Sequence, residues 1–269
     1  TATFNTSDSN KKSDKNFPSV EGRKYYSYDH EYMAVVSDHS VEIYKSDEKE
    51  PTTLNLHGRK VSYFEWMPDR ELAIMGFYGG KGDKVIMARL DPSNPDHEVD
   101  TELSGSKIDD VAYSTATNVV YMKVKVGEHK YRVYRTDANY DTRRVYMQAT
   151  DIGRIAVFYD EDNLFYDNAA KGEVYMFNGI TSQWRAINPE GSYRLIGIDS
   201  DRYIYLARVN SDNEVIRVER GNLGVGFSTL FTYKKPHNLD EVDVDTVLNL
   251  VANGSDDIEK SSDSDSSDK

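Results

Sequence analysis

The chain has 269 residues and a formal net charge of −13, from 33 basic and 46 acidic residues. This acidic balance excludes a general nucleic-acid or anionic-membrane surface, which needs clustered lysine and arginine, but it leaves room for a local basic patch. The absence of cysteine excludes disulfides, thiolate catalysis and cysteine-bound metals. Twenty tyrosines and nine phenylalanines provide the large apolar area that a β-rich core buries.

The first residues, 1–21, are polar and show no periodicity, so they predict a flexible leader. No apolar run approaches the roughly 20 residues of a membrane span. We therefore expect membrane anchoring only through residues absent from this chain.

The stretch Gly58–Leu103 contains four short β-type runs separated by turn sequences. A proline-containing turn separates the first two runs, and the glycine-rich turn Gly79–Asp83 separates the second from the third. Four such runs joined by turns are typical of one blade of a β-propeller.

The same pattern recurs along the chain in four more divergent copies. The five units begin near Gly22, Gly58, Gly105, Asp151 and Gly191, with a mean interval of about 42 residues. The sequence therefore predicts an all-β fold, a five-bladed β-propeller of four-stranded antiparallel blades over residues 22–236.

One hairpin adds a family resemblance. The segment Trp66–Leu72 (Trp-Met-Pro-Asp-Arg-Glu-Leu) resembles the Ser-Pro-Asp-Gly-Lys hairpin of the TolB-type, WD40-like propeller repeats, with Arg70 in place of the glycine. The other units lack this proline, and the Gly-His and Trp-Asp signatures of true WD40 repeats do not occur. The resemblance implies a propeller architecture and no particular activity.

The pattern changes to helical at residues 237–252. Asn238 is a suitable N-cap, and Val242, Val247, Leu248 and Val251 form an apolar stripe that is expected to pack on the last blade. Residues 253–269 are rich in serine and aspartate and predict a disordered acidic tail.

A basic residue stands at or near the start of the first strand of every unit. In a propeller the first strands line the central channel, so these residues predict a positive ring that binds an anionic ligand or an acidic partner segment. The alternative is that they are solubilising turn residues, some of them in salt bridges. The predicted ligand-binding set is Lys24, Lys60, Lys107, Arg154 and Arg194.

Paired acids raise the alternative of a carbohydrate-active hydrolase. Asp109 and Asp110 lie on a predicted inner strand and are the best candidates for two catalytic carboxylates. Asp160–Asp162 and Asp199–Asp201 have the spacing of calcium ligands, but neither continues into a full binding loop. The histidines show no ligand spacing. We therefore predict no catalytic residue, metal or cofactor.

Taken together, these features favour a non-catalytic β-propeller interaction module that binds a protein partner or an anionic ligand at the channel face. Missing cysteines and polar ends suit an extracytoplasmic protein, secreted or attached to a bacterial surface. The alternatives are the hydrolase described above and a structural ring in a larger surface assembly.

Overall fold

The computed structural model describes residues 16–259. The predicted leader up to residue 15 and the predicted tail from residue 260 lie outside the described residues. The chain divides into two compact units, which are described here as the N-terminal unit (described residues 16–147) and the C-terminal unit (residues 148–259).

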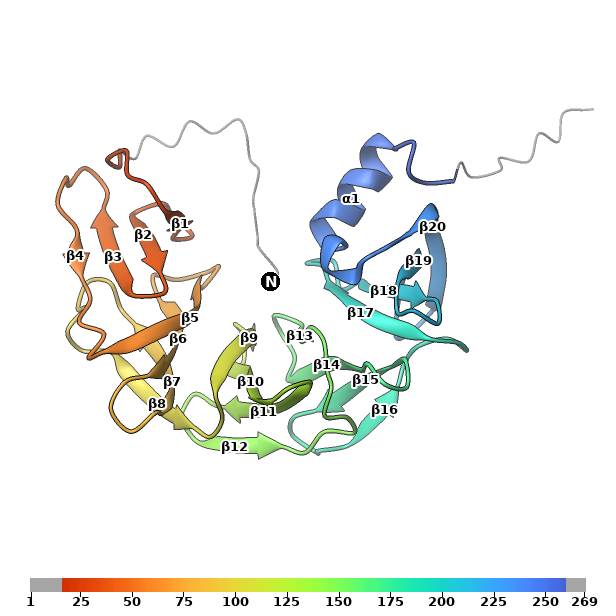
Figure 1. Cartoon of the computed structure of the whole chain (residues 1–269), viewed down its shortest axis with the longest axis horizontal. Helices are drawn as coiled ribbons and strands as arrows, with labels where there is room; N and C mark the ends of the chain where they lie inside the picture. Colours follow the sequence, from red (N-terminus) through yellow and green to blue (C-terminus); the bar gives the residue numbers. More distant parts are fainter. Residues whose placement is uncertain (1–15, 260–269) are drawn as a thin grey trace, which may run out of the picture. The chain divides into compact units, whose positions relative to one another are not determined.

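The N-terminal unit contains three four-stranded antiparallel sheets, which follow one another along the chain (Figure 1). Within each sheet, neighbouring strands in sequence are neighbours in space. Sheet 1 comprises β1 (Arg23–Tyr26), β2 (Tyr32–Ser37), β3 (Ser40–Lys45) and β4 (Thr52–Thr53). Sheet 2 comprises β5 (Arg59–Trp66), β6 (Ala73–Gly79), β7 (Val85–Leu90) and β8 (Val99–Leu103). Sheet 3 comprises β9 (Lys107–Ser114), β10 (Val119–Gly127), β11 (Lys130–Thr136) and β12 (Thr142–Val145).

The C-terminal unit contains two sheets of the same kind, followed by helices. Sheet 4 comprises β13 (Ala156–Val157), β14 (Asn163–Asn168), β15 (Glu173–Asn178) and β16 (Trp184–Ala186). Sheet 5 comprises β17 (Tyr193–Ile198), β18 (Ile204–Val209), β19 (Val215–Asn222) and β20 (Gly226–His237). A 3₁₀ turn, η1 (Leu239–Glu241), precedes the helix α1 (Val244–Asn253). Five four-stranded antiparallel sheets confirm the predicted blade pattern.

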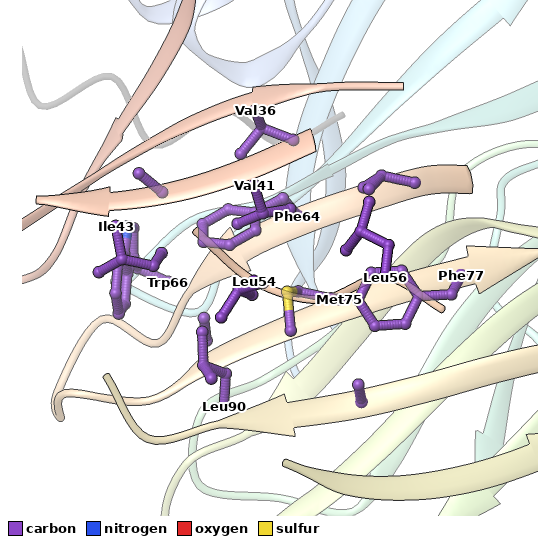
Figure 2. Close-up of a cluster of buried hydrophobic side chains, with 14 of the residues drawn as sticks. Val36, Val41, Ile43, Leu54, Leu56, Phe64, Trp66, Met75, Phe77 and Leu90 are labelled. Atoms are coloured by element: carbon purple, nitrogen blue, oxygen red, sulfur yellow. The ribbon is translucent and has the colours of Figure 1, made fainter. Parts of the chain in front are cut away.

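Apolar side chains from adjacent sheets pack face to face. Figure 2 shows the cluster between sheets 1 and 2, in which Val41 and Ile43 lie near Phe64 and Trp66. The Trp66 indole N–H donates to the Tyr25 carbonyl at 2.9 Å, so this large side chain is buried with its polar atom satisfied. Similar clusters lie between sheets 2 and 3 and between sheets 4 and 5.

The C-terminal helix packs on sheet 5, but its predicted apolar stripe is wrong in two positions. Val247 is fully buried, whereas Leu248 and Val251 are 40% and 48% exposed. Asp243 is the N-cap of α1, while Asn238 caps the preceding 3₁₀ turn, so Val242 lies before the helix and not on it. Val244 and Leu250 pack with Val247 in the cluster on sheet 5.

Residues just outside the predicted propeller boundaries contact its sheets. Ile258 forms an antiparallel bridge with Tyr233, and the Lys234 N–H donates to the Asp257 carbonyl at 2.8 Å. At the other end, the Asn16 carbonyl accepts from the Asp47 N–H at 2.9 Å. Segments that sequence polarity assigns to the leader and the tail therefore bond to the β3–β4 turn and to the edge strand β20, because backbone hydrogen bonds do not depend on side-chain polarity.

Candidate functional site

Two of the predicted basic residues converge on one aromatic ring in the N-terminal unit. Lys60 on β5 and Lys107 on β9 are exposed, and each ammonium nitrogen lies close to the ring centre of Tyr78 on β6, at 6.0 and 5.9 Å. Lys60 is also the cross-strand neighbour of Tyr78. An ammonium group within about 6 Å of an aromatic ring is attracted to its negative face. We refer to Lys60, Tyr78 and Lys107 as the lysine–tyrosine surface.

The two lysines occupy equivalent positions in their sheets. The register of β5 skips Ser62, and the register of β9 skips Asp109, so each strand has a β-bulge with one unpaired residue. Each lysine lies two residues before its bulge. A bulge changes the direction of a strand locally, and its repetition indicates a shared feature of these blades. The bulges give no signal in the hydrophobic pattern and could not be predicted from it.

Lys24, the third predicted basic residue of this unit, occupies a different position along its strand. Lys24 is exposed on β1, a strand of four residues. In sheets 1 and 2, a backbone hydrogen bond closes the turn after the first strand: the Ser27 N–H donates to the Tyr32 carbonyl, and the Met67 N–H donates to the Leu72 carbonyl. Lys24 lies three residues before Ser27, whereas Lys60 lies seven residues before Met67. Lys24 is therefore not the positional equivalent of Lys60, although both side chains are exposed.

Arg194, in the C-terminal unit, is buried and paired. Its Nε donates to Asp167 Oδ2 at 2.9 Å, and the carboxyl group of Asp167 is fully buried. Asp167 also accepts from the backbone N–H groups of Gly153 and Leu195, at 2.7 and 3.0 Å. This arrangement satisfies a buried charge with several donors. It gives Arg194 a structural contact between β17 and β14.

Arg154 also has partners within the C-terminal unit. Its Nη1 donates to the Val242 carbonyl at 2.6 Å and its Nη2 to the Leu239 carbonyl at 2.9 Å. These carbonyls lie at η1, where the last backbone acceptors of a helical turn need donors from elsewhere. Arg154 thus holds the segment before α1 in place.

The predicted hydrolase pair shows structural contacts as well. Asp109, the bulge residue of β9, forms an ion pair with Lys123 at 3.4 Å, and its Oδ1 is buried without a hydrogen bond to a described residue. Burial raises the pKa of Asp109, while Lys123 opposes this change. Asp110 Oδ1 accepts from the Val111 N–H at 2.9 Å. The neighbouring Lys123 ammonium lies 4.1 Å from the Tyr131 ring centre.

Glu65, a carboxylate that the sequence analysis did not single out, lies on β5 and contacts β9. Glu65 accepts a hydrogen bond from the Tyr63 hydroxyl and another from the Tyr113 hydroxyl, the latter at 3.1 Å. Burial is the main cause that raises the pKa of Glu65 to about 7, and the two hydroxyl donors act in the opposite direction. The alternation Tyr-x-Glu on one strand was the available signal, because residues i and i+2 share a face.

The aspartates with calcium-like spacing serve turns in the structure. Arg202 binds Asp160 and Glu161 at 2.5 Å each. Asp199 Oδ1 accepts from the N–H groups of Asp201 and Tyr203, at 2.9 and 3.0 Å. Across residues 16–259, no group of three or more histidine, aspartate or glutamate side chains is placed to hold a metal ion.

The sheets define the chain as a five-bladed β-propeller protein with a short C-terminal helix, and comparisons with solved structures agree. The chain is similar to TolB from Acinetobacter baumannii, with a TM-score of 0.51 and 12% identity over 79% of this chain and 52% of that one. It is also similar to a putative TolB from Agrobacterium tumefaciens, with a TM-score of 0.53 and 12% identity over 80% and 82% of the two chains.

These likenesses concern the fold, and they confirm the TolB-like architecture that the Trp66–Leu72 hairpin indicates. This chain spans about half the length of the Acinetobacter structure. No protein-family model and no curated protein matches the sequence. No helix in the described part of the chain has the length and apolar character needed to cross a bilayer.

Proposed function

We propose that this protein is a non-catalytic interaction module of the β-propeller class, acting outside the cytoplasm, that binds an acidic segment of a protein partner. The observation that supports the proposal most strongly is the lysine–tyrosine surface, where two exposed ammonium groups from adjacent sheets lie about 6 Å from the Tyr78 ring. Lys24 extends the set of exposed cations on the first strands of the N-terminal unit.

The charge balance of the chain makes this surface distinctive. Two exposed lysines brought together in a protein of net charge −13 attract an anion locally, while the negative charge of the rest of the molecule repels it. Tyr78 adds a flat apolar surface beside the charges, and tyrosine is enriched at protein interfaces. Arg154 and Arg194 complete the predicted set of five, but both donate hydrogen bonds within the chain. We therefore assign them a structural role and do not include them in the proposed binding surface.

The experiment measures binding of a fluorescently labelled peptide of ten glutamates by fluorescence anisotropy at low salt. We expect the double variant Lys60→Gln/Lys107→Gln to bind roughly fivefold more weakly, because each exposed charge pair contributes up to about 1 kcal/mol. The matched control is Lys234→Gln/Lys235→Gln, which makes the same charge change at two exposed positions of the C-terminal unit. Equal losses in the two double variants would refute this site.

A further inference from the structure

A small pocket lies between sheets 2 and 3, at the strand ends opposite to the lysine–tyrosine surface. Its volume is about 200 Å³. It is bounded by the turns that follow β5, β9 and β11, whereas Lys60 and Lys107 lie at the starts of β5 and β9. A strand of eight residues separates its two ends by roughly 20 Å, so the pocket and the lysine–tyrosine surface are distinct sites.

The pocket combines an apolar wall with two arginines. Met67, Leu72, Ile74 and Val120 provide the apolar part. Arg70 and Arg89 provide the positive charge, and the remaining lining residues are Tyr113, Ser114, Asn118, Asp137, Ala138 and Tyr140. Ligand sites in proteins typically pair an apolar lining with a few placed polar groups.

Arg89 is the central feature of this pocket. It lies on the interior strand β7 with only 9% of its surface exposed, and its Nη1 makes no hydrogen bond to any described residue. Keeping a positive charge this deeply buried is costly, so the guanidinium group favours an anionic ligand in the pocket that it lines. The guanidinium carbon lies 4.5 Å from the Tyr140 ring centre, which fixes the plane of the group against an aromatic side chain.

The walls around Arg89 are held in place by hydrogen bonds. Arg70 Nη1 donates to Asn118 Oδ1 at 2.7 Å, and its Nη2 donates to the Thr115 carbonyl at 3.1 Å, which joins the two turns. Asp137 Oδ1 accepts from the N–H groups of Asn139 and Asp141, at 2.9 and 3.0 Å. Asp137, the one acidic group in the lining, therefore has two of its hydrogen bonds within its own turn, and its charge also acts on Arg89.

We propose that this pocket binds a carboxylate carried on a small apolar group, with the Arg89 guanidinium donating to the carboxylate. Charge-assisted hydrogen bonds from arginine to a carboxylate are among the strongest in proteins. A volume of 200 Å³ exceeds the roughly 150 Å³ of a cavity that accepts benzene, so a single ring or a short branched chain fits beside the charge. A free small acid and an apolar residue at the C-terminal end of a peptide both present this chemistry.

The test titrates the full chain with benzoate and with benzamide, its uncharged counterpart, and follows backbone amide signals by NMR. We expect benzoate to shift the signals of Ser114, Asn118 and Ala138, and benzamide to bind at least about tenfold more weakly. A second pair of probes is an acetylated tripeptide ending in phenylalanine, with a free or an amidated C-terminus. Tighter binding of benzoate identifies a free acid as the source, and tighter binding of the free-ended peptide identifies a chain end.

The variant Arg89→Met keeps an unbranched side chain and removes its donors, and it should bind the carboxylate probe at least about tenfold more weakly than the wild type. The matched control is Arg220→Met, since Arg220 also lies over a tyrosine ring, 4.8 Å from the centre of Tyr203, but in the C-terminal unit. The proposal is overturned if neither carboxylate probe binds, if each binds no better than its amide, or if the shifted signals lie outside the pocket. These three outcomes are measured on the wild type and hold even if Arg89→Met fails to fold.

Discussion

Arg194 and Asp167 form a buried ion pair, with 2.9 Å between Arg194 Nε and Asp167 Oδ2, and it joins the first strand of sheet 5 to the second strand of sheet 4. The side chain of Asp167 is fully buried and that of Arg194 is 7% exposed. Gly153 packs against the same pair, because a Cβ at that position would lie 2.7 Å from Arg194 Nη2. The ion pair is therefore enclosed by Gly153 and by the two strands that carry its partners, β14 and β17.

The first prediction concerns Asp167→Ala. Removing one partner leaves the Arg194 charge buried and unpaired, so we expect the free energy of unfolding to fall by about 3–5 kcal/mol. Urea unfolding followed by circular dichroism measures the change. The control is Asp38→Ala, which breaks the exposed pair with Arg23 and should cost at most about 1 kcal/mol. Similar losses in both variants would show that the buried pair has no special role.

Arg194 and Lys60 illustrate how far the sequence carries the site. Both stand at the beginning of a first strand, and the repeat pattern placed both strands correctly. The partner that removes Arg194 from the surface is Asp167, which is 27 residues earlier in the chain, and a one-dimensional pattern does not reveal that contact. The contact of Lys60 and Lys107 with Tyr78 depends in the same way on how sheets 2 and 3 pack. The sequence therefore predicted the two lysines as site residues but not the tyrosine ring that they share.

The second prediction concerns Gly76→Ala on β6. An added Cβ would lie 3.0 Å from Ile108 Cβ and 3.2 Å from Tyr63 Cβ, and neither atom can rotate away, since each is attached directly to the backbone. Overpacking typically costs about 1–3 kcal/mol, which exceeds the gain of up to about 1 kcal/mol from replacing a strand glycine. We therefore expect a net loss of about 1–2 kcal/mol in the free energy of unfolding.

The control for Gly76 is Gly224→Ala in the β19–β20 hairpin, where the nearest atom, Asn222 Oδ1, is 3.5 Å from the added Cβ. That variant should retain wild-type stability within about 0.5 kcal/mol. If Gly76→Ala is as stable as Gly224→Ala in the same urea titration, sheets 2 and 3 do not approach as closely as the structure shows.

The fold was predictable because each sheet is local in sequence. Four consecutive strands pair in order within every sheet, so turn residues and apolar runs were sufficient to mark the repeats. The bulges at Ser62 and Asp109 were not predictable, because one extra residue in a strand leaves the surrounding composition unchanged. The helix stripe failed at Leu248 and Val251, because a helical period shows which residues share a side but not how much of that side the sheet covers.

The third prediction is a pH dependence centred on Glu65. Its pKa in the folded chain is raised to about 7 from an ordinary value of 4.5, so folding favours the protonated carboxyl group. The stability that this group contributes is fully present below about pH 4.5 and is lost as the pH rises through about 7. A shift of this size corresponds to at most about 3.5 kcal/mol, since each pKa unit is worth about 1.4 kcal/mol.

Glu65→Gln is the matched variant, because glutamine, like the protonated carboxyl group, offers one acceptor oxygen and one donor group to the Tyr63 and Tyr113 hydroxyls and does not ionise. The difference in the free energy of unfolding between wild type and variant should therefore change by about 1–3 kcal/mol in favour of the variant between pH 4.5 and 8. Parallel stability profiles over that range would mean that Glu65 ionises freely in the folded protein.

The fourth prediction compares two valines on the same helix. Val247 is fully buried against sheet 5, whereas Val251, one turn later, is 48% exposed. Val247→Ala removes buried methyl groups and leaves a cavity, so we expect a loss of about 1–3 kcal/mol, while Val251→Ala should change the stability by less than about 0.5 kcal/mol. Both variants make the same small gain in helix propensity, so their difference isolates the packing of α1. Equal stabilities in urea titrations would place the helix in another rotation or away from the sheet, and would reinstate the stripe that Leu248 and Val251 suggest from sequence.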